Sequence, residues 1–202
     1  MGAFKDDVEV YDPVNTNKNV YYSKVMYKQG EISLQINKGS IILNKEKQKA
    51  KLVVDESTAE FMREISAAVV EITSEKSEHF FGKKINSEDC ESIYKEALVK
   101  DNILHCFYDD DTYFYETKNT QVSIEDIPTE LEGIALLKCS AVVYTKNSFF
   151  IRWEVSQFKL KKHKILEEPY YMKEYIIKDL PDHSNPLDGD PLLKKLDEIC
   201  LF

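Results

Sequence analysis

The chain has 202 residues, a formal net charge of -9 and 43% hydrophobic residues, among them 12 Tyr, 10 Phe and one Trp. Only six Gly and six Pro occur, which excludes a fibrous repeat, and the even spread of apolar residues excludes wholesale disorder. These values predict one globular domain with a tail. No run approaches the roughly 18 apolar residues of a membrane span, so we expect no membrane partner.

The spacing of cysteines and histidines disfavours disulfides and a structural zinc site. The cysteines form no CxxC pair, and the four histidines show neither HxH nor HExxH spacing. We therefore expect buried free thiols in a reducing, intracellular compartment. The cysteines are Cys90, Cys106, Cys139 and Cys200.

The acidic total hides an uneven distribution of charge. Residues 18–51 carry eight bases and two acids, and residues 145–178 carry eight bases and four acids. Residues 52–144 between them carry eight bases and twenty acids. A fold that brings the two basic segments together would build a basic face on an acidic protein, which favours an anionic partner. Lysines that merely populate solvated loops are the alternative.

Residues 1–19 are expected to form an N-terminal arm ahead of the domain. The run VYYSKVMYKQ (residues 20–29) alternates, which predicts a strand with Tyr22, Lys24 and Lys28 on one face. ISLQIN, IIL and KLVV then complete a meander of three strands whose lysine-rich tip is NKEKQKAK.

The spacing of the apolar residues then changes from the alternation of a strand to the period of a helix. Ser57 and Glu60 have capping-box spacing, and apolar residues recur at helical intervals from about Thr58 to about Ser77. A second, shorter helix is predicted after Ser87. This helical block interrupts the sheet once.

Strand patterns resume after the helices. ILHCFY and TYFYE surround Asp109, Asp110 and Asp111, which predict a hairpin turn. GIALLKCSAVVYT and FFIRWEVSQFKL, joined by KNS, form the clearest hairpin of the sequence. Simple alternation divides this hairpin into a core face and a solvent face. The predicted solvent face carries Lys138, Ser140, Tyr144, Lys146, Phe150, Arg152, Glu154 and Phe158.

The order of strands, helix and strands predicts a mainly β fold, an OB-fold-like barrel with inserted helices over residues 20–165. One helix is expected between the third and fourth strands. An α+β domain with an open antiparallel sheet is the alternative. Residues 166–202 are expected to form a C-terminal extension, and Trp153 is assigned to the core.

The motifs of common enzymes are absent from the sequence. It contains no P-loop, GxGxxG, nucleophile elbow or zincin motif, and three adjacent aspartates on a turn point in different directions. We expect no catalysis, no metal and no cofactor. The only two arginines are Arg63 and Arg152, and this scarcity disfavours sequence-specific reading of duplex DNA.

Binding of a single nucleic-acid strand needs cations for the phosphates and flat rings for the bases. The predicted solvent faces interleave both. Phosphate contacts are predicted at Lys24, Lys28, Lys45, Lys47, Lys49, Lys51, Lys138, Lys146 and Arg152. Stacking contacts are predicted at Tyr22, Tyr144, Phe150 and Phe158. If the hairpin were pleated the other way, Phe149 and Trp153 would be the exposed rings instead.

Four runs of the sequence carry a family resemblance: GEISLQINKGSIILN, KLVVD, HFFGKKIN and GIALLKCSAVVYTKNSFFIRWEVSQFKL. They resemble the single-stranded DNA-binding proteins of nucleocytoplasmic large DNA viruses, a group related to the replicative single-stranded DNA-binding protein of certain tailed phages. The resemblance covers residues 20–165, and its most specific part is the hairpin with Trp153, Gln157 and Lys159. It implies an OB-fold, a basic aromatic groove for single strands, and a role in viral DNA replication, recombination and repair.

The same resemblance has consequences for the end of the chain and for its location. The phage proteins end in an acidic tail whose terminal Phe contacts polymerase and helicase, and Phe202 matches that residue, which implies binding of replication proteins. The tail differs from theirs, because residues 179–202 net only -4 and contain Lys194 and Lys195. A viral protein of this kind would work in the host cytoplasm or in a viral factory.

The sequence thus predicts sequence-tolerant, non-catalytic binding of single-stranded DNA, with a homo-oligomer as one possible state. A protein-interaction or virion structural module without nucleic-acid binding is the alternative, and a metal-dependent nuclease is the third reading. The sequence leaves open the oligomeric state, the cooperativity, the site size and the choice between DNA and RNA.

Overall fold

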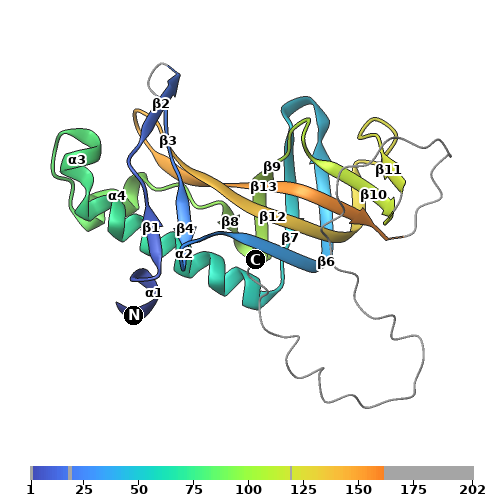
Figure 1. The fold of residues 1–202 in the computed structure, drawn as a ribbon, viewed down its shortest axis with the longest axis horizontal. Helices are drawn as coiled ribbons and strands as arrows, with labels where there is room; N and C mark the ends of the chain where they lie inside the picture. Colours follow the sequence, from blue (N-terminus) through green and yellow to red (C-terminus); the bar gives the residue numbers. More distant parts are fainter. Residues whose placement is uncertain (1, 18–19, 119, 162–202) are drawn as a thin grey trace, which may run out of the picture.

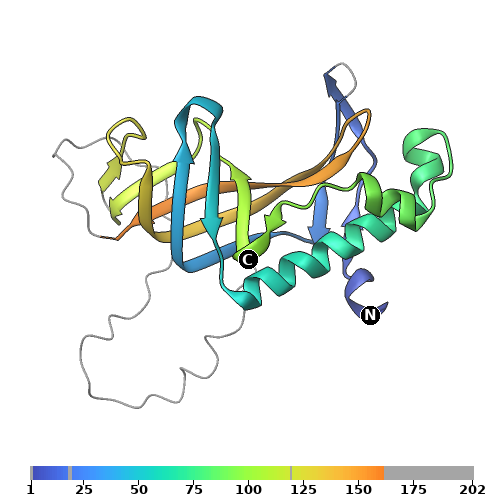
Figure 2. The same cartoon turned by 180° about the vertical axis from the view of Figure 1, so that it is seen from behind.

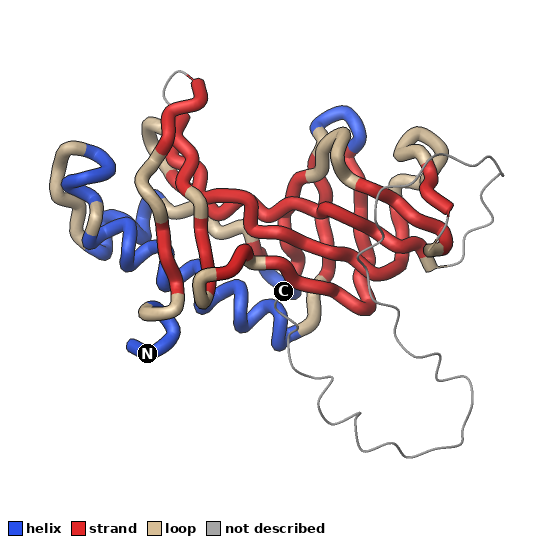
Figure 3. Tube along the Cα trace, viewed as in Figure 1, coloured by secondary structure: helices blue, strands red, loops and turns tan. Residues whose placement is uncertain are grey.

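The computed structural model describes residues 2–17, 20–118 and 120–161. As predicted, the fold is mainly β, with one large curled sheet and a few helices (Figure 1; Figure 3). The helices are α1 (Gly2–Lys5), α2 (Glu56–Glu75), α3 (Ser77–Phe81) and α4 (Ser87–Ile93), with the 3-10 turns η1 (Lys45–Lys47) and η2 (Lys100–Asn102). The strands are β1 (Val8–Val10), β2 (Val14–Asn17), β3 (Val20–Ser23), β4 (Val25–Tyr27), β5 (Gly30–Glu31), β6 (Ser33–Asn44), β7 (Lys49–Val53), β8 (Leu98–Val99), β9 (Ile103–Phe107), β10 (Tyr113–Thr117), β11 (Thr120–Val122), β12 (Glu130–Tyr144) and β13 (Phe149–Leu160).

Five strands of the large sheet pair in a closed ring. β6 pairs antiparallel with β7 and β12, β7 pairs antiparallel with β9, and β12 pairs antiparallel with β13. A parallel contact between β9 and β13 closes the ring where Phe107 lies opposite Glu154. This ring is an OB-fold-like barrel of five strands, and the alternative of an open antiparallel sheet is wrong.

The helix is inserted between the second and third barrel strands, β7 and β9, and not between the third and fourth. The prediction failed because residues 20–29, counted as the first barrel strand, lie outside the ring. In addition, ISLQIN and IIL form one continuous strand, β6, which passes through Gly39 instead of ending there. Gly39 lies opposite Gly133 of β12, and a Cβ on Gly133 would overlap the carbonyl oxygen of Lys159. The two facing glycines therefore permit the close approach of three strands.

α2 runs along one side of the molecule, the lower side in the ribbon views (Figure 1; Figure 2). The helix begins after Asp55, whose carboxylate accepts a hydrogen bond of 2.8 Å from the backbone N–H of Thr58. This cap satisfies one of the unpaired donors of the first turn, so Asp55 replaces the predicted cap at Ser57. The apolar residues at helical intervals are buried as predicted, with Ile65 and Val69 both 0% exposed.

The residues predicted to form an arm are part of the folded unit. β1 pairs with β4 and β2 pairs with β3, and Val8 and Val10 are buried in the core. The predicted strand over residues 20–29 is in fact two strands separated by Lys24. β3 joins the large sheet, whereas β4 joins β1 and β5 in a separate sheet of three strands.

In the second half of the sheet, the predicted hairpin of β12 and β13 is present, but the predicted hairpin of β9 and β10 is not. β12 and β13 pair across the KNS turn, as predicted. β9 and β10 do not form a hairpin across Asp109 to Asp111, because they lie on opposite sides of β13. After β10 the chain forms one more short strand, β11, which pairs antiparallel with β10. The expected C-terminal extension, residues 166–202, lies outside the described residues.

The core confirms two predictions about individual side chains. Trp153 is 2% exposed, and the cysteines among the described residues, Cys90, Cys106 and Cys139, are buried and free. Burial raises the pKa of the Cys106 and Cys139 thiols to about 12. In the described part of the chain, no helix has both the length and the apolar composition needed to cross a membrane.

Candidate nucleic-acid interface

The outward side chains of β7, β9, β12 and β13 form one surface of the barrel, which we call the basic–aromatic face. Lys49 lies opposite Phe107 and Lys51 opposite His105, and the next strands place Glu154 opposite both Phe107 and Lys138. Directly opposed residues share one face of a sheet. The face consists of Lys49, Lys51, His105, Phe107, Lys138, Phe150 and Arg152, with Glu154 among them.

Phe107 is the aromatic centre of this face. The Nζ atom of Lys49 lies 5.5 Å from the centroid of the Phe107 ring, and the Cζ atom of Arg152 lies 4.6 Å from it. The ring of Phe150 stacks beside it, with centroids 6.5 Å apart and 25° between the planes. Both phenylalanines are half-buried. A cation over an aromatic ring is attracted by the π-electrons of that ring. Lys49 and Arg152 are therefore held at the ring on which a base would stack.

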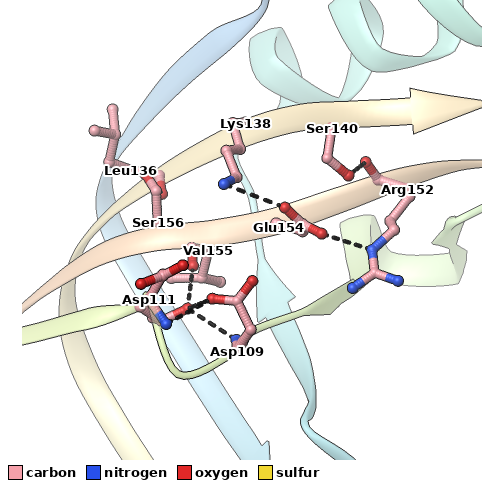
Figure 4. A network of polar contacts seen from close by, with 10 residues as sticks. Asp109, Asp111, Leu136, Lys138, Ser140, Arg152, Glu154, Val155 and Ser156 are labelled. Carbon is pink, nitrogen blue, oxygen red and sulfur yellow. Dashed lines mark hydrogen bonds and ion pairs between the residues drawn. The ribbon is translucent and has the colours of Figure 1, made fainter. Parts of the chain in front are cut away.

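The largely buried carboxylate of Glu154 contacts two cations of the face, Arg152 and Lys138 (Figure 4). Glu154 is 8% exposed, and its carboxylate accepts a hydrogen bond of 2.6 Å from Nε of Arg152 and lies 3.3 Å from Nζ of Lys138. Charge-assisted contacts of this kind orient the guanidinium. They also mean that a phosphate approaching Arg152 or Lys138 competes with a carboxylate for the same two cations.

Two turns connect barrel strands: one projects from the side of the barrel opposite α2, and the other lies at the far end of the β12–β13 hairpin, near α3 (Figure 1; Figure 2). The first is η1, which joins the first two barrel strands, and the second is the turn of residues 145–148, which joins the last two. In OB-folds the loops at these two positions flank the ligand-binding face. η1 carries Lys45 and Lys47, and the second turn carries Lys146.

A groove of about 630 Å³ lies between η1 and the outer face of β7 and β9. Lys51, His105 and Phe107 line it together with Ile42 of β6. Lys45 also lines it, but its ammonium donates hydrogen bonds to the carbonyl oxygens of residues 125 and 127, at 3.2 and 2.8 Å. Lys45 therefore holds η1 against the barrel, whereas Lys51 forms no ion pair with another described residue and keeps its charge available to a ligand.

Two predicted stacking residues are in the core, which corrects the prediction that they face solvent. Tyr144 is 2% exposed and Phe158 is 0% exposed. Register shifts in the pairing of β12 with β13, one between Cys139 and Ala141 and one between Leu136 and Leu137, explain both errors. Each bulge adds a residue and inverts the inside–outside alternation beyond it. The pleat is nevertheless not reversed as a whole, because Trp153 remains inside.

The remaining predicted residues are divided between the face and other surfaces. Tyr22 shares the sheet row of Val143 and Phe150, which places it on the same side as the face. Lys24 pairs with Glu31 at 2.9 Å, and this contact lowers the pKa of the Glu31 carboxyl. Lys28 lies over the ring of Tyr27 and 3.8 Å from Asp7.

Lys28 is therefore at the end of the molecule that holds α1 and is separate from the basic–aromatic face. Lys47 and Lys146 are exposed on their turns. Phe202, the predicted partner-binding residue, lies outside the described residues.

Sequence reasoning missed Phe107, His105 and the pairing role of Glu154. A signal for the first two was present, since ILHCFY alternates and places His105 with Phe107 opposite the apolar Leu104 and Cys106. No such signal identifies Glu154. Its contact with Lys138 depends on the register of β12 against β13, and its other partner, Arg152, lies on its own strand.

The aspartate turn next to the face is closed by hydrogen bonds (Figure 4). The N–H of Asp111 donates to the carboxylate of Asp109 at 3.0 Å, and the hydroxyl of Thr112 donates to the carbonyl oxygen of Val155 at 2.7 Å. Within the described ranges, no group of three or more His, Cys, Asp or Glu side chains is placed to hold a metal ion.

Residues 39–179 match a protein family described as "Family of unknown function (DUF5871)". The chain belongs to this family. The matched segment begins within β6 and includes every strand that contributes to the basic–aromatic face. No curated protein and no solved structure matches the chain.

Proposed function

We propose that the chain binds single-stranded DNA through the basic–aromatic face, with tolerance for sequence and without catalysis. The observation that carries the proposal is the position of Phe107, which lies between Lys49 and Arg152 and beside Phe150 on the outer face of β9. Single-strand binding combines cations that follow the backbone with rings on which bases stack. An OB-fold-like barrel uses this same face for oligonucleotides.

The charges of the face support single-strand binding better than duplex reading. Its cations are mainly lysines, which act as point charges toward phosphate, whereas base-edge reading in a groove relies on bidentate arginines. Arg152 is the exception, and its Nε is engaged by Glu154. The resemblance described above supports the same conclusion and extends the proposal to viral DNA replication, recombination and repair.

A titration with fluorescently labelled oligonucleotides tests the proposal. Oligo-dT and a mixed single strand should bind with similar affinity, and a duplex of the same length should bind at least about tenfold more weakly. With four phosphate contacts, log K should fall against log salt with a slope of about -3. Absence of single-strand binding at low salt would overturn the proposal, and metal-dependent degradation of the oligonucleotide would favour the nuclease instead.

A protein-interaction module is the second candidate, and one observation favours it. Ile42, Val53 and Val99 are large apolar side chains that are 44%, 44% and 41% exposed. β7 and β8 both pair with β9 and present Val53 and Val99 opposite Ile103. An apolar strip of this kind suits a protein partner. Loss of a partner complex on Val53→Ser with unchanged oligonucleotide binding would establish this second role.

A further inference from the structure

A second hollow, of about 450 Å³, lies at the far end of the β12–β13 hairpin from the groove beside η1. We call it the hairpin-end pocket. It shares no lining residue with the groove on the basic–aromatic face. Its walls come from the hairpin turn, from α3 and from the segment between α3 and α4. The residues that define it here are Phe80, Phe81, Lys83, Ile85, Lys146 and Phe149.

The floor of this pocket is apolar and fixed in place. Phe149 is 1% exposed, and the rings of Phe80 and Phe81 pack at 5.8 and 5.5 Å from the ring of Tyr144. The Tyr144 hydroxyl points inward, where it shares a hydrogen bond of 3.1 Å with Thr73. The floor therefore presents ring and aliphatic carbon atoms to a ligand.

The wall formed by residues 82–86 is also held by hydrogen bonds. The N–H of Ile85 donates to the hydroxyl of Ser77 at 2.8 Å, and its carbonyl oxygen accepts from the hydroxyl of Ser74 at 3.0 Å. Both backbone groups of Ile85 are thus tied to the helical segment. The hollow exists before any ligand arrives, which lowers the cost of filling it.

The rim is positively charged on a protein whose total charge is negative. Lys83 and Lys146 are exposed and form no ion pair within the described part of the chain. No Asp or Glu is among the residues that line the pocket. By contrast, Lys24, Lys138 and Arg152 each pair with a carboxylate. The rim therefore complements an anionic ligand.

We infer that the hairpin-end pocket binds an acidic peptide segment of a partner protein, through one large apolar side chain that enters the pocket and carboxylates that pair with Lys83 and Lys146. A nucleobase is the less favoured occupant, because the part of its polar edge over the rings of the floor would lose hydrogen bonds, and the polar groups that line the pocket lie mainly at Thr145, Asn147 and Ser148 of the hairpin turn. A Phe or Leu side chain carries no such penalty. An apolar anchor in a preformed pocket with charges at its rim is a common arrangement at protein interfaces.

Two adjacent lysines offer a matched pair for the test. Lys83 lines the pocket, whereas Lys84 is exposed beside it and does not line it. A random library of 12-residue peptides is selected on the full chain, and the recovered peptides are synthesised for titration against three proteins: the unchanged chain, Lys83→Glu and Lys84→Glu. Equal melting temperatures confirm that the variants fold.

The recovered peptides should share one Phe, Trp or Leu next to Asp or Glu. Replacement of that apolar residue by Ala should weaken binding by at least about tenfold, and Lys83→Glu should weaken it by about tenfold. Lys84→Glu should change it by less than about twofold. An excess of oligo-dT should leave the peptide bound.

Three results would overturn the inference: no enrichment of acidic apolar peptides, equal effects of Lys83→Glu and Lys84→Glu, or displacement of the peptide by oligo-dT together with loss of oligonucleotide binding in Lys83→Glu. The last result would assign the pocket to nucleic acid. The inference does not rest on the proposed function, since a chain that fails to bind DNA can still bind the peptide.

Discussion

Two pairs of aromatic residues on the barrel strands β9, β12 and β13 have opposite environments. Phe107 and Phe150 lie half-buried on the outer face of the barrel beside Lys49 and Arg152. Tyr144 and Phe158 lie in the core, although plain alternation places both of them with Phe150. Residue type and local pattern therefore do not decide which rings reach solvent. The bulges between β12 and β13 decide it.

The largest expected effect comes from the buried pair. Phe158→Ala removes a fully buried ring, and large core truncations of this kind cost about 3 to 5 kcal/mol of unfolding free energy. Chemical denaturation should give a loss in this range. Phe150→Ala is the matched control and should cost less than about 1.5 kcal/mol, because its ring is only partly buried. Equal losses from the two variants would contradict the assignment of faces.

The outward-facing pair, Phe107 and Phe150, should govern binding of the oligonucleotide. Phe107→Ala should weaken binding of oligo-dT by about 1 to 3 kcal/mol, the range measured for loss of one stacking ring. The salt slope should stay nearly constant, because stacking releases no counterions. Anisotropy titrations at several salt concentrations measure both quantities. A Phe107→Ala protein that is folded and binds with unchanged affinity would remove this ring from the interface.

A smaller effect, of opposite sign, is expected at Glu154. Glu154→Gln keeps an acceptor for Nε of Arg152 and removes the charge that competes with phosphate, so binding should tighten severalfold. The salt slope should steepen by about 0.7 for each cation that is freed to contact a phosphate. Glu71→Gln on α2, whose carboxylate also pairs with a lysine, is the control and should change neither. Weaker binding of Glu154→Gln would indicate that its charge is needed to position Arg152.

The smallest effects separate Lys51, which forms no ion pair among the described residues, from Lys28, which lies near Asp7. Lys51→Ala should reduce the steepness of the salt slope by about 0.7, the contribution of one phosphate contact to a single strand. Lys28→Ala should leave the slope unchanged, since Lys28 lies beside Asp7 at the other end of the molecule. Titrations of both variants in parallel distinguish these outcomes, and equal changes would mean that binding follows overall charge instead of this face.

Much of the fold was predictable because its signals are local. Helical periodicity located α2, and β-branched and aromatic runs located the β12–β13 hairpin. The error in helix insertion came from residues 20–29, which lie outside the ring, and from Gly39, which the sequence presents as a break. In the structure it faces Gly133 where strands approach closely. Only the long-range pairing of strands distinguishes a glycine that ends a strand from a glycine that allows two strands to approach closely.

The site was predictable only in part for a related reason. Alternation identified Phe150 and Arg152 correctly as outward residues, because no bulge separates them from each other on β13. Lys49 and Lys51 were predicted on a loop, and they lie instead on the outer face of β7. Alternation failed at Tyr144 and Phe158, which lie beyond a bulge. The ion pair of Lys138 with Glu154 depends on cross-strand register, which a single strand does not encode.

Photo-crosslinking tests most directly whether the strand lies on the basic–aromatic face. An oligonucleotide substituted with 5-bromodeoxyuridine is irradiated with the full chain, and the attached peptides are identified by mass spectrometry. Crosslinks are expected within residues 103–107 and 149–152, and they should disappear in excess unlabelled oligo-dT. Crosslinks confined to residues 80–85 and 144–148, or none under conditions where the oligonucleotide binds, would contradict this placement of the oligonucleotide.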